Sequence, residues 1–562
     1  MNKDLLFTPV LPCSVAREFE REFFADFDEG GRGCDEREFM RRAAAGVARE
    51  TLAVFRETFR REPRTVHVLA GKGHNAADAL LAAALLCEDR SQITVQLFTP
   101  RYELAPATRS ALSALEKEGA SVLPADEDDD DEYGGEDDDH GDATGGAAAP
   151  CDGDGPVADV LLDGVFGHNF RPPLSALHTN LIDWVNEHPN FLLRVAVDMP
   201  SGLALHADLT VACGLVKAPL LAPENASVRG RLRLVEIGFA APPPHGETPS
   251  EFVTGARMFA ATAPAILAGS PLNEARPPLA DKRRHGHLLI LGGSRPMPGA
   301  LLLNVRAALR AGVGLVTAFC PESVHAAFAA AAPEAMWVPW PETPAGGLAL
   351  EGEHLLRERL PRATALLCGS GMGAEPETLA LLESIAGSAP CPLVLDADAL
   401  RPEIVAAALR RPEKTPPSPL SCGPSLALLP HAGEFERIAP ALPTALPWNV
   451  AIARKGAPTV VAGGGAWEVV SGCDRDFTAA CEILVCAGGP VLARGGSGDL
   501  LAGIAGALVA RFEDGHGVFR PLLDAVALHA AAGDLLAAAE HPQTARLSAL
   551  LDYLGEALAG AR

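Results

Sequence analysis

Two kinds of hydrophobic spacing alternate along the first 240 residues. Residues 34–60 mix Ala, Leu, Val and Phe with Arg and Glu at the spacing of an amphipathic helix. Residues 65–70 (TVHVLA) are short and β-branched, as in a buried parallel strand, and an Ala/Leu-rich helical stretch leads to a second such strand at 93–98 (ITVQLF). The order strand, helix, strand predicts a βαβ unit. Two more strands, each ending in Asp and Gly, are predicted at 157–167 and 191–202.

The second half of the chain repeats this alternation on a larger scale. A Pro-rich polar stretch at 240–255 predicts a domain boundary. Beyond it, six apolar runs closed by Gly, Asp or His alternate with Ala/Leu-rich helical stretches, which predicts a larger doubly wound sheet. The six predicted strands are 287–293, 314–320, 365–373, 392–400, 426–435 and 458–464. We therefore expect an α/β protein of two domains, residues 1–245 and residues 252–562.

An acidic segment interrupts the first of these domains. The chain of 562 residues has a formal net charge of −25, and 14 acidic residues, with no Lys or Arg, lie between Asp126 and Asp154. Such a segment repels itself and has too little apolar area to offset its ordering entropy, so we expect a disordered surface insertion at about 124–156. A sink for Ca²⁺ or Mg²⁺ is the alternative, although a spaced ligand loop is missing. The acidic balance argues against a nucleic-acid or anionic-membrane partner.

The cysteines and the N-terminal residues bear on the compartment. Twelve cysteines are scattered singly, without a CxxC pair or a zinc-like Cys/His spacing, which is typical of reduced thiols. The N-terminal residues contain Pro and acids before any apolar core long enough for a signal peptide, and the other apolar stretches contain Gly, Pro or charges. We expect a soluble cytoplasmic protein.

The strongest chemical signal is a glycine-rich turn at 488–499 (GGPVLARGGSGD), which an apolar helical stretch follows directly. Free backbone N–H groups and the positive end of the dipole at a helix start form an anion site, so we expect a phosphate there. Asp499 stands at the start of this helix. A carboxylate beside a phosphate is costly unless it acts as a base on an attacking hydroxyl, as in kinases. An N-cap Asp is the structural alternative.

Six motifs stand in order between residues 252 and 558. They are GGSRPMPGA (292–300), GSGMG (369–373), DADAL (396–400), PHAGEF (430–435), ARKGAPT (453–459) and GGSGDLLAG (495–503). With these motifs the segment resembles the ADP- or ATP-dependent NAD(P)H-hydrate dehydratases, a branch of the ribokinase-like fold. The resemblance implies that the hydrated dinucleotide contacts Ala300, Gly371, His431 and Asp499. It also implies that the adenine nucleotide contacts Lys455, Gly456, Ala457, Pro458, Thr459 and Gly498.

The residue chemistry at these motifs agrees with the implied roles. Lys455 before a glycine is a compact cation where backbone approaches phosphate, and His431 in a strand-end loop can donate to an amide or a hydroxyl. A turn histidine with satisfied hydrogen bonds is the alternative for His431. Asp396 and Asp398 are either a Mg²⁺ pair or turn caps, and Glu434 is a weaker metal candidate.

Three residues depart from the dehydratase pattern. Leu429, Gly489 and Arg494 stand where the family usually has Thr, Asn and Thr. We expect these changes to soften nucleotide contacts without removing the anion site or the base, so activity should survive them.

Oxygen-bearing side chains also follow successive predicted strands in the N-terminal half. They stand in GKGHNAADAL (71–80), DGVFGHNF (163–170), VDMPSGL (197–203) and TVACGLVKAP (210–219). Strand ends of a wound sheet converge on one crevice. With these motifs, residues 34–239 resemble NAD(P)H-hydrate epimerases, which bacteria commonly fuse ahead of the dehydratase.

The epimerase resemblance implies a set of site residues. A potassium site would consist of Asn75, Asp163 and Ser201, Asp198 would lie near the C6 hydroxyl of the substrate, and Lys217 belongs to the same pattern. The dinucleotide-binding loops would be His74, Asn75, Ala76, Ala77 and Asp78, and Gly167, His168, Asn169, Phe170, Arg171, Pro172 and Pro173.

One motif of this half departs from the epimerase family. Where Asn-Asn-Gly-Gly-Asp-Gly is usual, the chain has His74-Asn75-Ala76-Ala77-Asp78-Ala79, so three close-approach glycines gain a methyl group. Ala favours a helix start, so the fold is kept while the approach of the pyrophosphate becomes tighter. An active epimerase and a weakened, scaffolding domain are both left open.

Together the resemblances imply a Rossmann-like three-layer N-terminal domain and a ribokinase-like α/β/α C-terminal domain. They imply repair of hydrated NADH and NADPH: the first domain epimerises the R and S hydrates, and the second dehydrates the S hydrate at the expense of ADP, with Mg²⁺, to give NAD(P)H, AMP and phosphate. We expect a homo-oligomer. The alternatives are a dehydratase with an inactive N-terminal domain, a ribokinase-like small-molecule kinase, and a non-catalytic dinucleotide-binding regulator.

Overall fold

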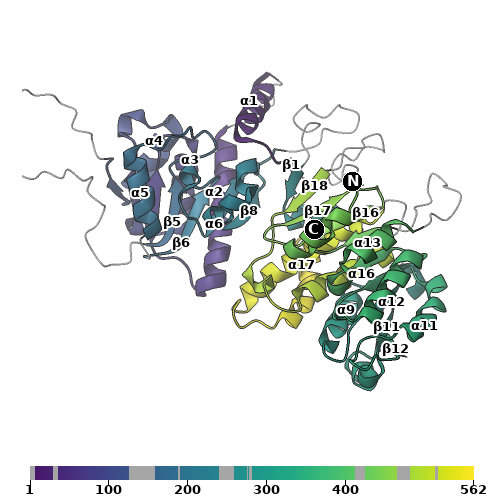
Figure 1. The fold of residues 1–562 in the computed structure, drawn as a ribbon. Helices are drawn as coiled ribbons and strands as arrows, with labels where there is room; N and C mark the ends of the chain where they lie inside the picture. Colours follow the sequence, from purple (N-terminus) through teal and green to yellow (C-terminus); the bar gives the residue numbers. More distant parts are fainter. Residues whose placement is uncertain are drawn as a thin grey trace, which may run out of the picture. The chain divides into compact units, whose positions relative to one another are not determined.

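The computed structural model describes residues 7–29, 36–125, 158–187, 190–239, 258–274, 276, 281–411, 425–464, 481–512 and 517–561. The chain divides into two compact units (Figure 1). The N-terminal unit is Val10–Phe239, and the C-terminal unit joins Met1–Pro9 to Ala240–Arg562. Thr8 and Pro9 therefore belong to the unit that follows, whereas the sequence pattern assigns residues 1–245 to one domain. The predicted acidic insertion lies outside the described residues from residue 126 onward.

The N-terminal unit is built on a parallel sheet of seven strands in the order β4-β3-β2-β5-β6-β7-β8. All five residues of its apolar strand β2 are buried, as expected for a parallel strand that helices cover on both faces. The strands are β2 (Val66–Ala70), β3 (Ile93–Leu97), β4 (Ser121–Leu123), β5 (Ala158–Gly164), β6 (Phe191–Val197), β7 (Leu209–Cys213) and β8 (Arg231–Val235). The helices are α1 (Cys13–Glu29), α2 (Glu36–Phe59), α3 (His74–Leu86), α4 (Pro106–Lys117), α5 (Ala176–Glu187) and α6 (Ala226–Arg229).

The strand order of this sheet reverses between β2 and β5. The chain runs outward from β2 through β3 to β4 and then returns to β5 on the other side of β2. The loops after β2 and β5 therefore diverge and leave a crevice at the carboxyl ends of the strands, where open α/β sheets bind their ligands.

The C-terminal unit contains a mixed sheet of eleven strands in the order β1-β9-β18-β17-β16-β15-β14-β13-β10-β11-β12. The pairs β1·β9, β16·β17 and β17·β18 are antiparallel, and the others are parallel. The strands are β1 (Thr8–Pro9), β9 (Met258–Ala261), β10 (His287–Leu291), β11 (Leu315–Pro321), β12 (Met336–Trp340), β13 (Ala365–Cys368), β14 (Leu393–Leu395), β15 (Leu426–Leu428), β16 (Val450–Arg454), β17 (Thr459–Gly463) and β18 (Cys481–Val485). Here the order reverses between β10 and β13, so a second crevice is expected after these strands.

Helices cover both faces of the eleven-stranded sheet. Leu288 and Ile290 of β10 belong to one core cluster, and the alternate residues Leu289 and Leu291 belong to another, which is the period of two that a strand imposes. The first face is covered by α9, α16 and α17, and the second by α12 and α13. The helices of this unit are α8 (Ala263–Ala268), α9 (Pro298–Arg310), α10 (His325–Ala331), α11 (Glu353–Arg357), α12 (Pro376–Ser388), α13 (Pro402–Leu409), α14 (Ala432–Ile438), α16 (Ser497–Arg511), α17 (Phe519–Ala539) and α18 (Leu554–Ala559).

Helix α17 is the one described helix that is long and apolar enough to cross a membrane by length and composition. Of its most apolar window, 72% is buried inside the protein. It packs against α16, α8 and the strands β16 and β17. This position is that of a core helix.

Candidate functional site

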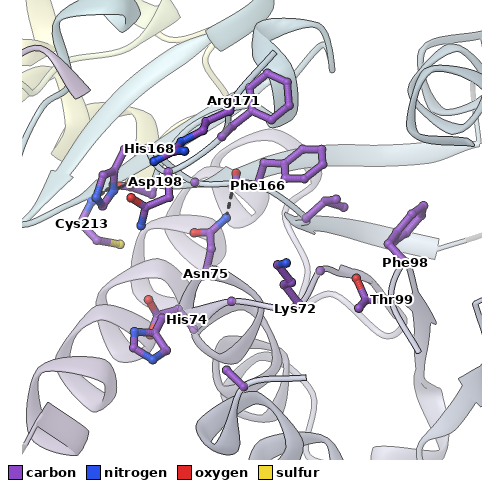
Figure 2. A pocket seen from close by; sticks show the side chains of 18 of the residues that line it. Lys72, His74, Asn75, Phe98, Thr99, Phe166, His168, Arg171, Asp198 and Cys213 are labelled. Carbon is purple, nitrogen blue, oxygen red and sulfur yellow. Dashed lines mark hydrogen bonds and ion pairs between the residues drawn. The ribbon is translucent and has the colours of Figure 1, made fainter. Parts of the chain in front are cut away.

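The crevice of the N-terminal unit is a cavity of about 910 Å³, toward the upper end of the range for small-molecule sites. Loops after β2, β5, β6 and β7 line it, as does α1. Figure 2 shows His168, Asp198 and Cys213 at one side of the cavity and Phe98 and Thr99 at the other. The predicted epimerase residues that line it are His74, Asn75, Asp78, Gly167, His168, Asn169, Phe170, Arg171, Pro173 and Asp198.

Three predicted binding residues, Ala76, Ala77 and Pro172, do not line this cavity. Ala76 and Ala77 have no exposed surface. A Cβ atom on Gly164 would lie 2.7 Å from the Ala79 Cβ and 3.1 Å from the Ala76 Cα, so α3 packs closely on β5 here. Pro172 is exposed on its loop. Ala76 and Ala79 therefore pack against β5, and the tighter approach of the pyrophosphate stays a prediction.

Asp198 is the electrostatic centre of the cavity. It follows β6 with a φ of +66°, a conformation that non-glycine residues rarely adopt and that concentrates at functional sites. Its Oδ1 accepts hydrogen bonds from Lys217 Nζ at 2.5 Å and Cys213 N at 3.3 Å, and its Oδ2 lies 3.3 Å from His168 Nδ1. Burial would raise the pKa of Asp198, but the Lys217 cation and His168 hold it well below its usual range. Asp198 is therefore a carboxylate at neutral pH.

Two further ionisable groups near Asp198, Lys217 and Asp78, also have shifted pKa values. Burial lowers the pKa of Lys217, but Asp198 and Glu20 outweigh it, so the pKa of this amine is raised. Burial raises the pKa of Asp78 well above its usual value, and the nearby Asp198 and Glu20 raise it further. Asp78 Oδ1 is buried without a hydrogen-bond partner among the described residues. A protonated carboxyl group here can donate to a ligand.

The three predicted potassium ligands lie in one hydrogen-bonded chain. Asn75 Nδ2 donates to Phe166 O at 3.1 Å, and Phe166 N donates to Ser201 Oγ at 2.9 Å. Ser201 Oγ donates to Asp163 Oδ1 at 2.5 Å, and Ser201 N donates to Asp163 Oδ2 at 2.7 Å. Burial raises the pKa of Asp163 to about 6, although the hydrogen bonds from Ser201 and the Val165 N–H oppose this shift. A fully buried carboxyl group with oxygen neighbours and no paired cation fits a hard cation.

Aromatic rings line the far side of the cavity, and of these the sequence pattern predicted Phe170 but not Phe98, Phe166 or His178. The ring centroid of Phe166 lies 4.7 Å from that of His178 and 4.8 Å from that of Phe170, and Phe98 lies 6.0 Å from His178. Such rings offer a stacking surface to a planar heterocycle. The signal in the sequence is weak, because these residues come from the loop after β3, the loop after β5 and helix α5.

In the C-terminal unit, several of the strand-end motifs lie next to one another. Lys455 Nζ, after β16, donates to Asp396 Oδ1, after β14, at 2.6 Å and lies 3.9 Å from Glu434 Oε2. Lys455 N donates to Pro430 O at 2.8 Å, so the loop after β15 runs beside this lysine. A Cβ atom on Gly498 would lie 3.4 Å from Lys455 Nζ, which brings the lysine against the glycine turn. Among described residues, however, no group of three or more His, Cys, Asp or Glu could hold a metal ion.

Asp499 lies in the first turn of α16, behind Gly496. Burial raises the pKa of Asp499, and the nearby Asp396 and Asp398 carboxylates raise it further. The Ser370 hydroxyl and the Lys455 cation lower this pKa, but by less. The carboxyl group is half-buried and sits in an acidic cluster next to one cation. A carboxylate with a raised pKa is a stronger base once it is ionised.

The glycine turn before α16 contains one position whose backbone favours glycine and one with open space around it. Gly496 is the N-cap, with a φ of +94° that favours glycine, and a Cβ atom on Gly495 would meet nothing within 4 Å. Gly371, at a φ of +67°, packs against Ala300, whose Cβ would lie 2.8 Å from a Cβ on Gly371. The predicted substrate residues Ala300, in the first turn of α9, and Gly371, in the loop after β13, are therefore neighbours.

His431 and Asp398 have partners inside their own loops. His431 is the N-cap of α14: its Nδ1 accepts a hydrogen bond from Glu434 N, and the Glu434 carboxylate accepts one from His431 N. The His431 side chain is 61% exposed, and its Nε2 lies 3.4 Å from Glu434 Oε1. Asp398 Oδ2 accepts a hydrogen bond from Gly373 N at 2.8 Å. Both residues therefore make the hydrogen bonds expected of turn caps, and these bonds involve no ligand.

The structure explains Arg494, one of the three departures from the dehydratase pattern. Its guanidinium donates to Pro542 O and Ala545 O, both at 2.6 Å, and so ties the glycine turn to the C-terminal segment. Leu429 is fully buried in the core. Nothing in the structure explains Gly489.

These features define the class: a two-unit α/β protein with a cavity of about 910 Å³ in one unit and a glycine-rich turn beside a half-buried carboxylate in the other. The profile described as NAD(P)H-hydrate dehydratase matches residues 288–555, and the one described as YjeF-related protein N-terminus matches residues 36–219. The bifunctional NAD(P)H-hydrate repair enzyme of Gloeobacter violaceus is 34% identical over 495 residues, 84% of each chain. The chain belongs to the family of bifunctional NAD(P)H-hydrate repair enzymes.

Two further relatives cover the C-terminal half. The ADP-dependent (S)-NAD(P)H-hydrate dehydratase of Xanthomonas campestris is 36% identical over 290 residues, which cover 51% of this chain and 91% of that protein. The crystal structure of the ADP/ATP-dependent NAD(P)H-hydrate dehydratase from Bacillus subtilis, 23% identical, covers 53% of this chain and 97% of that chain with a TM-score of 0.39.

Proposed function

We propose that this chain repairs hydrated NADH and NADPH, with an epimerase in the N-terminal unit and an ADP-dependent dehydratase in the C-terminal unit. The family and the activities printed for its relatives support both reactions. The observation that carries the proposal is Asp499, a half-buried carboxylate of raised pKa in the first turn of α16, next to an open glycine turn and the Lys455 cation. This arrangement suits phosphoryl transfer to a hydroxyl group.

In the dehydratase, Asp499 takes the proton of the C6 hydroxyl as that oxygen attacks the β-phosphorus of ADP and AMP leaves. The backbone N–H groups of Gly495, Gly496 and Gly498 and the α16 dipole stabilise the charge on the transferring group. The C6–O bond then breaks with inorganic phosphate as the leaving group, and loss of a proton from the neighbouring ring carbon restores NAD(P)H. Ala300, Gly371 and His431 lie at the strand ends that would hold the hydrated ring.

The nucleotide would lie along the loop after β16. Lys455 would bind its phosphates, and Gly456, Ala457, Pro458, Thr459 and Gly498 would contact the rest. Mg²⁺ would neutralise phosphate charge next to Asp396 and Asp398. Asp396 already accepts a hydrogen bond from Lys455, and Asp398 accepts one from Gly373 N. Most contacts between these carboxylates and Mg²⁺ would therefore be made through water molecules.

In the epimerase, the ionised Asp198 would face the C6 hydroxyl, with the dinucleotide along the loops at His74–Asp78 and Gly167–Pro173. Potassium would lie at Asn75, Asp163 and Ser201, where it would supply the positive charge that the buried Asp163 lacks. The stacking surface of Phe98, Phe166 and His178 is suited to one of the substrate's ring systems. These features favour an active epimerase over a scaffolding domain.

Two expectations about the whole protein stay predictions: a homo-oligomer and a cytoplasmic location. The seven cysteines whose side chains the structure describes form no disulfide bond with one another, which supports a reducing compartment.

The test is a coupled assay on the full chain. Pure R hydrate and pure S hydrate are each incubated with ADP or ATP, and NADH recovery and free phosphate are followed together. We expect equal NADH and phosphate from both hydrates, with ADP as the better donor. A phosphorylated product that accumulates without NADH would identify a small-molecule kinase instead, and nucleotide binding without turnover would identify a regulator.

A further inference from the structure

Helix α1 carries an acidic side chain into the epimerase cavity. Glu20 lines the cavity, its Oε2 lies 3.3 Å from His168 Nε2, and its Oε1 lies 4.0 Å from Lys217 Nζ. The sequence pattern assigns no role to residues 13–29, and neither family profile includes Glu20. The structure thus brings a fourth charged group to the cluster around Asp198.

The four side chains form a closed ring in which acids and bases alternate. Asp198 contacts Lys217 Nζ and His168 Nδ1, and Glu20 contacts Lys217 Nζ and His168 Nε2. Each ring nitrogen of His168 therefore lies 3.3 Å from a carboxylate oxygen: Nδ1 makes a hydrogen bond with Asp198, and Nε2 makes an ion-pair contact with Glu20 that lacks hydrogen-bond geometry. Side-chain exposure is 1% for Lys217, 9% for Asp198, 12% for His168 and 23% for Glu20, so water is largely excluded from the ring.

Physical chemistry assigns Glu20 a definite task in this ring. A buried ammonium group is costly unless charges and acceptors surround it. Without Glu20, Lys217 Nζ would retain Asp198 Oδ1 and Cys213 O, at 3.5 Å, as its hydrogen-bond acceptors. His168 would retain a contact at Nδ1 alone and could rotate about its side-chain bonds. Lys217 and His168 both contact Asp198, so a change in their positions would also displace the carboxylate that faces the substrate.

We propose that Glu20 is a positioning residue of the epimerase site, which acts by holding Lys217 and His168 in the orientation that aims the Asp198 carboxylate at the C6 hydroxyl. Glu20 touches no reacting atom in this role. The inference rests on the proposed epimerase reaction and adds to it a residue from outside the matched segment of the N-terminal profile.

The test uses the full chain and three variants: Glu20→Gln, Glu20→Asp and the control Glu18→Gln. Glu18 lies on the same helix, is 54% exposed and pairs with Arg21, so its variant removes the same charge from the solvent side. Conversion of pure R hydrate to S hydrate without ADP is followed by chiral chromatography. We expect Glu20→Gln to lower kcat by ~10-fold to 100-fold with KM nearly unchanged, because misplaced catalytic groups cost rate more than binding. Glu20→Asp should recover part of kcat, and Glu18→Gln should match the parent.

A second readout does not depend on turnover. The ring-nitrogen NMR signals of His168, assigned by their loss in His168→Gln, should shift in Glu20→Gln and stay in place in Glu18→Gln. Unchanged kcat or unchanged His168 signals in Glu20→Gln would overturn the inference. It would also be overturned if Glu20→Gln lost kcat together with thermal stability and Glu20→Asp did not recover kcat. A parent chain that converts R hydrate no faster than the spontaneous rate would refute the epimerase reaction itself, and with it this role, whatever the His168 signals show.

Discussion

Asp499 carries the residue-scale prediction about chemistry. Asp499→Asn keeps the size of the side chain and removes the base, so dehydration of the S hydrate should fall by about 10²-fold or more. ADP binding, measured by calorimetry, should stay within a few-fold of the parent because the glycine turn and Lys455 are unchanged. The control is Asp552→Asn, which removes a 75% exposed carboxylate from the same unit. Near-normal turnover in Asp499→Asn would refute the base assignment.

A buried histidine on α17 carries a prediction about pH. The pKa of His529 falls to about 4, because burial disfavours the imidazolium, and its Nε2 lies 3.3 Å from Ser497 Oγ at the start of α16. The unfolded chain, with an ordinary histidine pKa of ~6.5, binds a proton first as the pH falls. The stability that His529 contributes is therefore present above about pH 6.5 and is lost as the pH falls toward 4, by up to about 3 kcal/mol.

The measurement is denaturant unfolding of the full chain at several pH values. The parent's free energy of unfolding for the C-terminal unit should fall between pH 6.5 and 4 more steeply than that of His529→Gln, whose amide keeps a polar atom near Ser497 without titrating. Parallel curves for the two proteins would contradict the assignment of this pH dependence to His529.

At the scale of elements, the junction of the glycine turn with α16 depends on one backbone conformation. Gly496 has a φ of +94°, and a side chain there costs about 1–2 kcal/mol. Gly496→Ala should therefore lower the stability of the C-terminal unit by that amount and weaken ADP binding, because the turn must shift. Gly495→Ala is the matched control for stability, since its Cβ meets nothing within 4 Å. Calorimetric unfolding without nucleotide compares the two, and equal losses would contradict the argument.

Element boundaries were predictable where hydrophobic runs were long. The predicted strands at 65–70, 93–98, 287–293 and 314–320 correspond to β2, β3, β10 and β11. The run at 426–435 contains only the three-residue β15, because the capping interactions of His431 and Glu434 start α14 directly after it. Helix α1 was missed because its apolar residues alternate with many charges and its packing partners lie far along the chain.

At the scale of the whole molecule, the first described residues stabilise the C-terminal unit, whose remaining residues begin at Ala240. Phe7 is fully buried in the core of the C-terminal unit, and Thr8–Pro9 pair with β9. Phe7→Ala should cost about 3–5 kcal/mol of that unit's stability. Dehydratase activity should then be lost at a lower temperature while R-to-S conversion is kept.

The matched variant is Phe55→Ala, which empties a fully buried position of the N-terminal unit. It should show the reverse order, with epimerisation lost first on heating. If Phe7→Ala lowered only the heat resistance of epimerisation, the assignment of the first residues to the C-terminal unit would be wrong.

By itself, the sequence determined what depends on neighbours along the chain: the α/β class, the strand ends that carry Asn75, Asp163 and Asp198, and the glycine turn before Asp499. These follow from local periodicity and from the conformational freedom of glycine. Only the tertiary structure decided the pairing of Lys455 with Asp396, 59 residues away, the arrival of Glu20 beside His168, the inward packing of Ala76 on Gly164, and the unit to which Phe7 belongs. Each of these contacts depends on the packing free energy of a whole unit, which no short segment of sequence encodes.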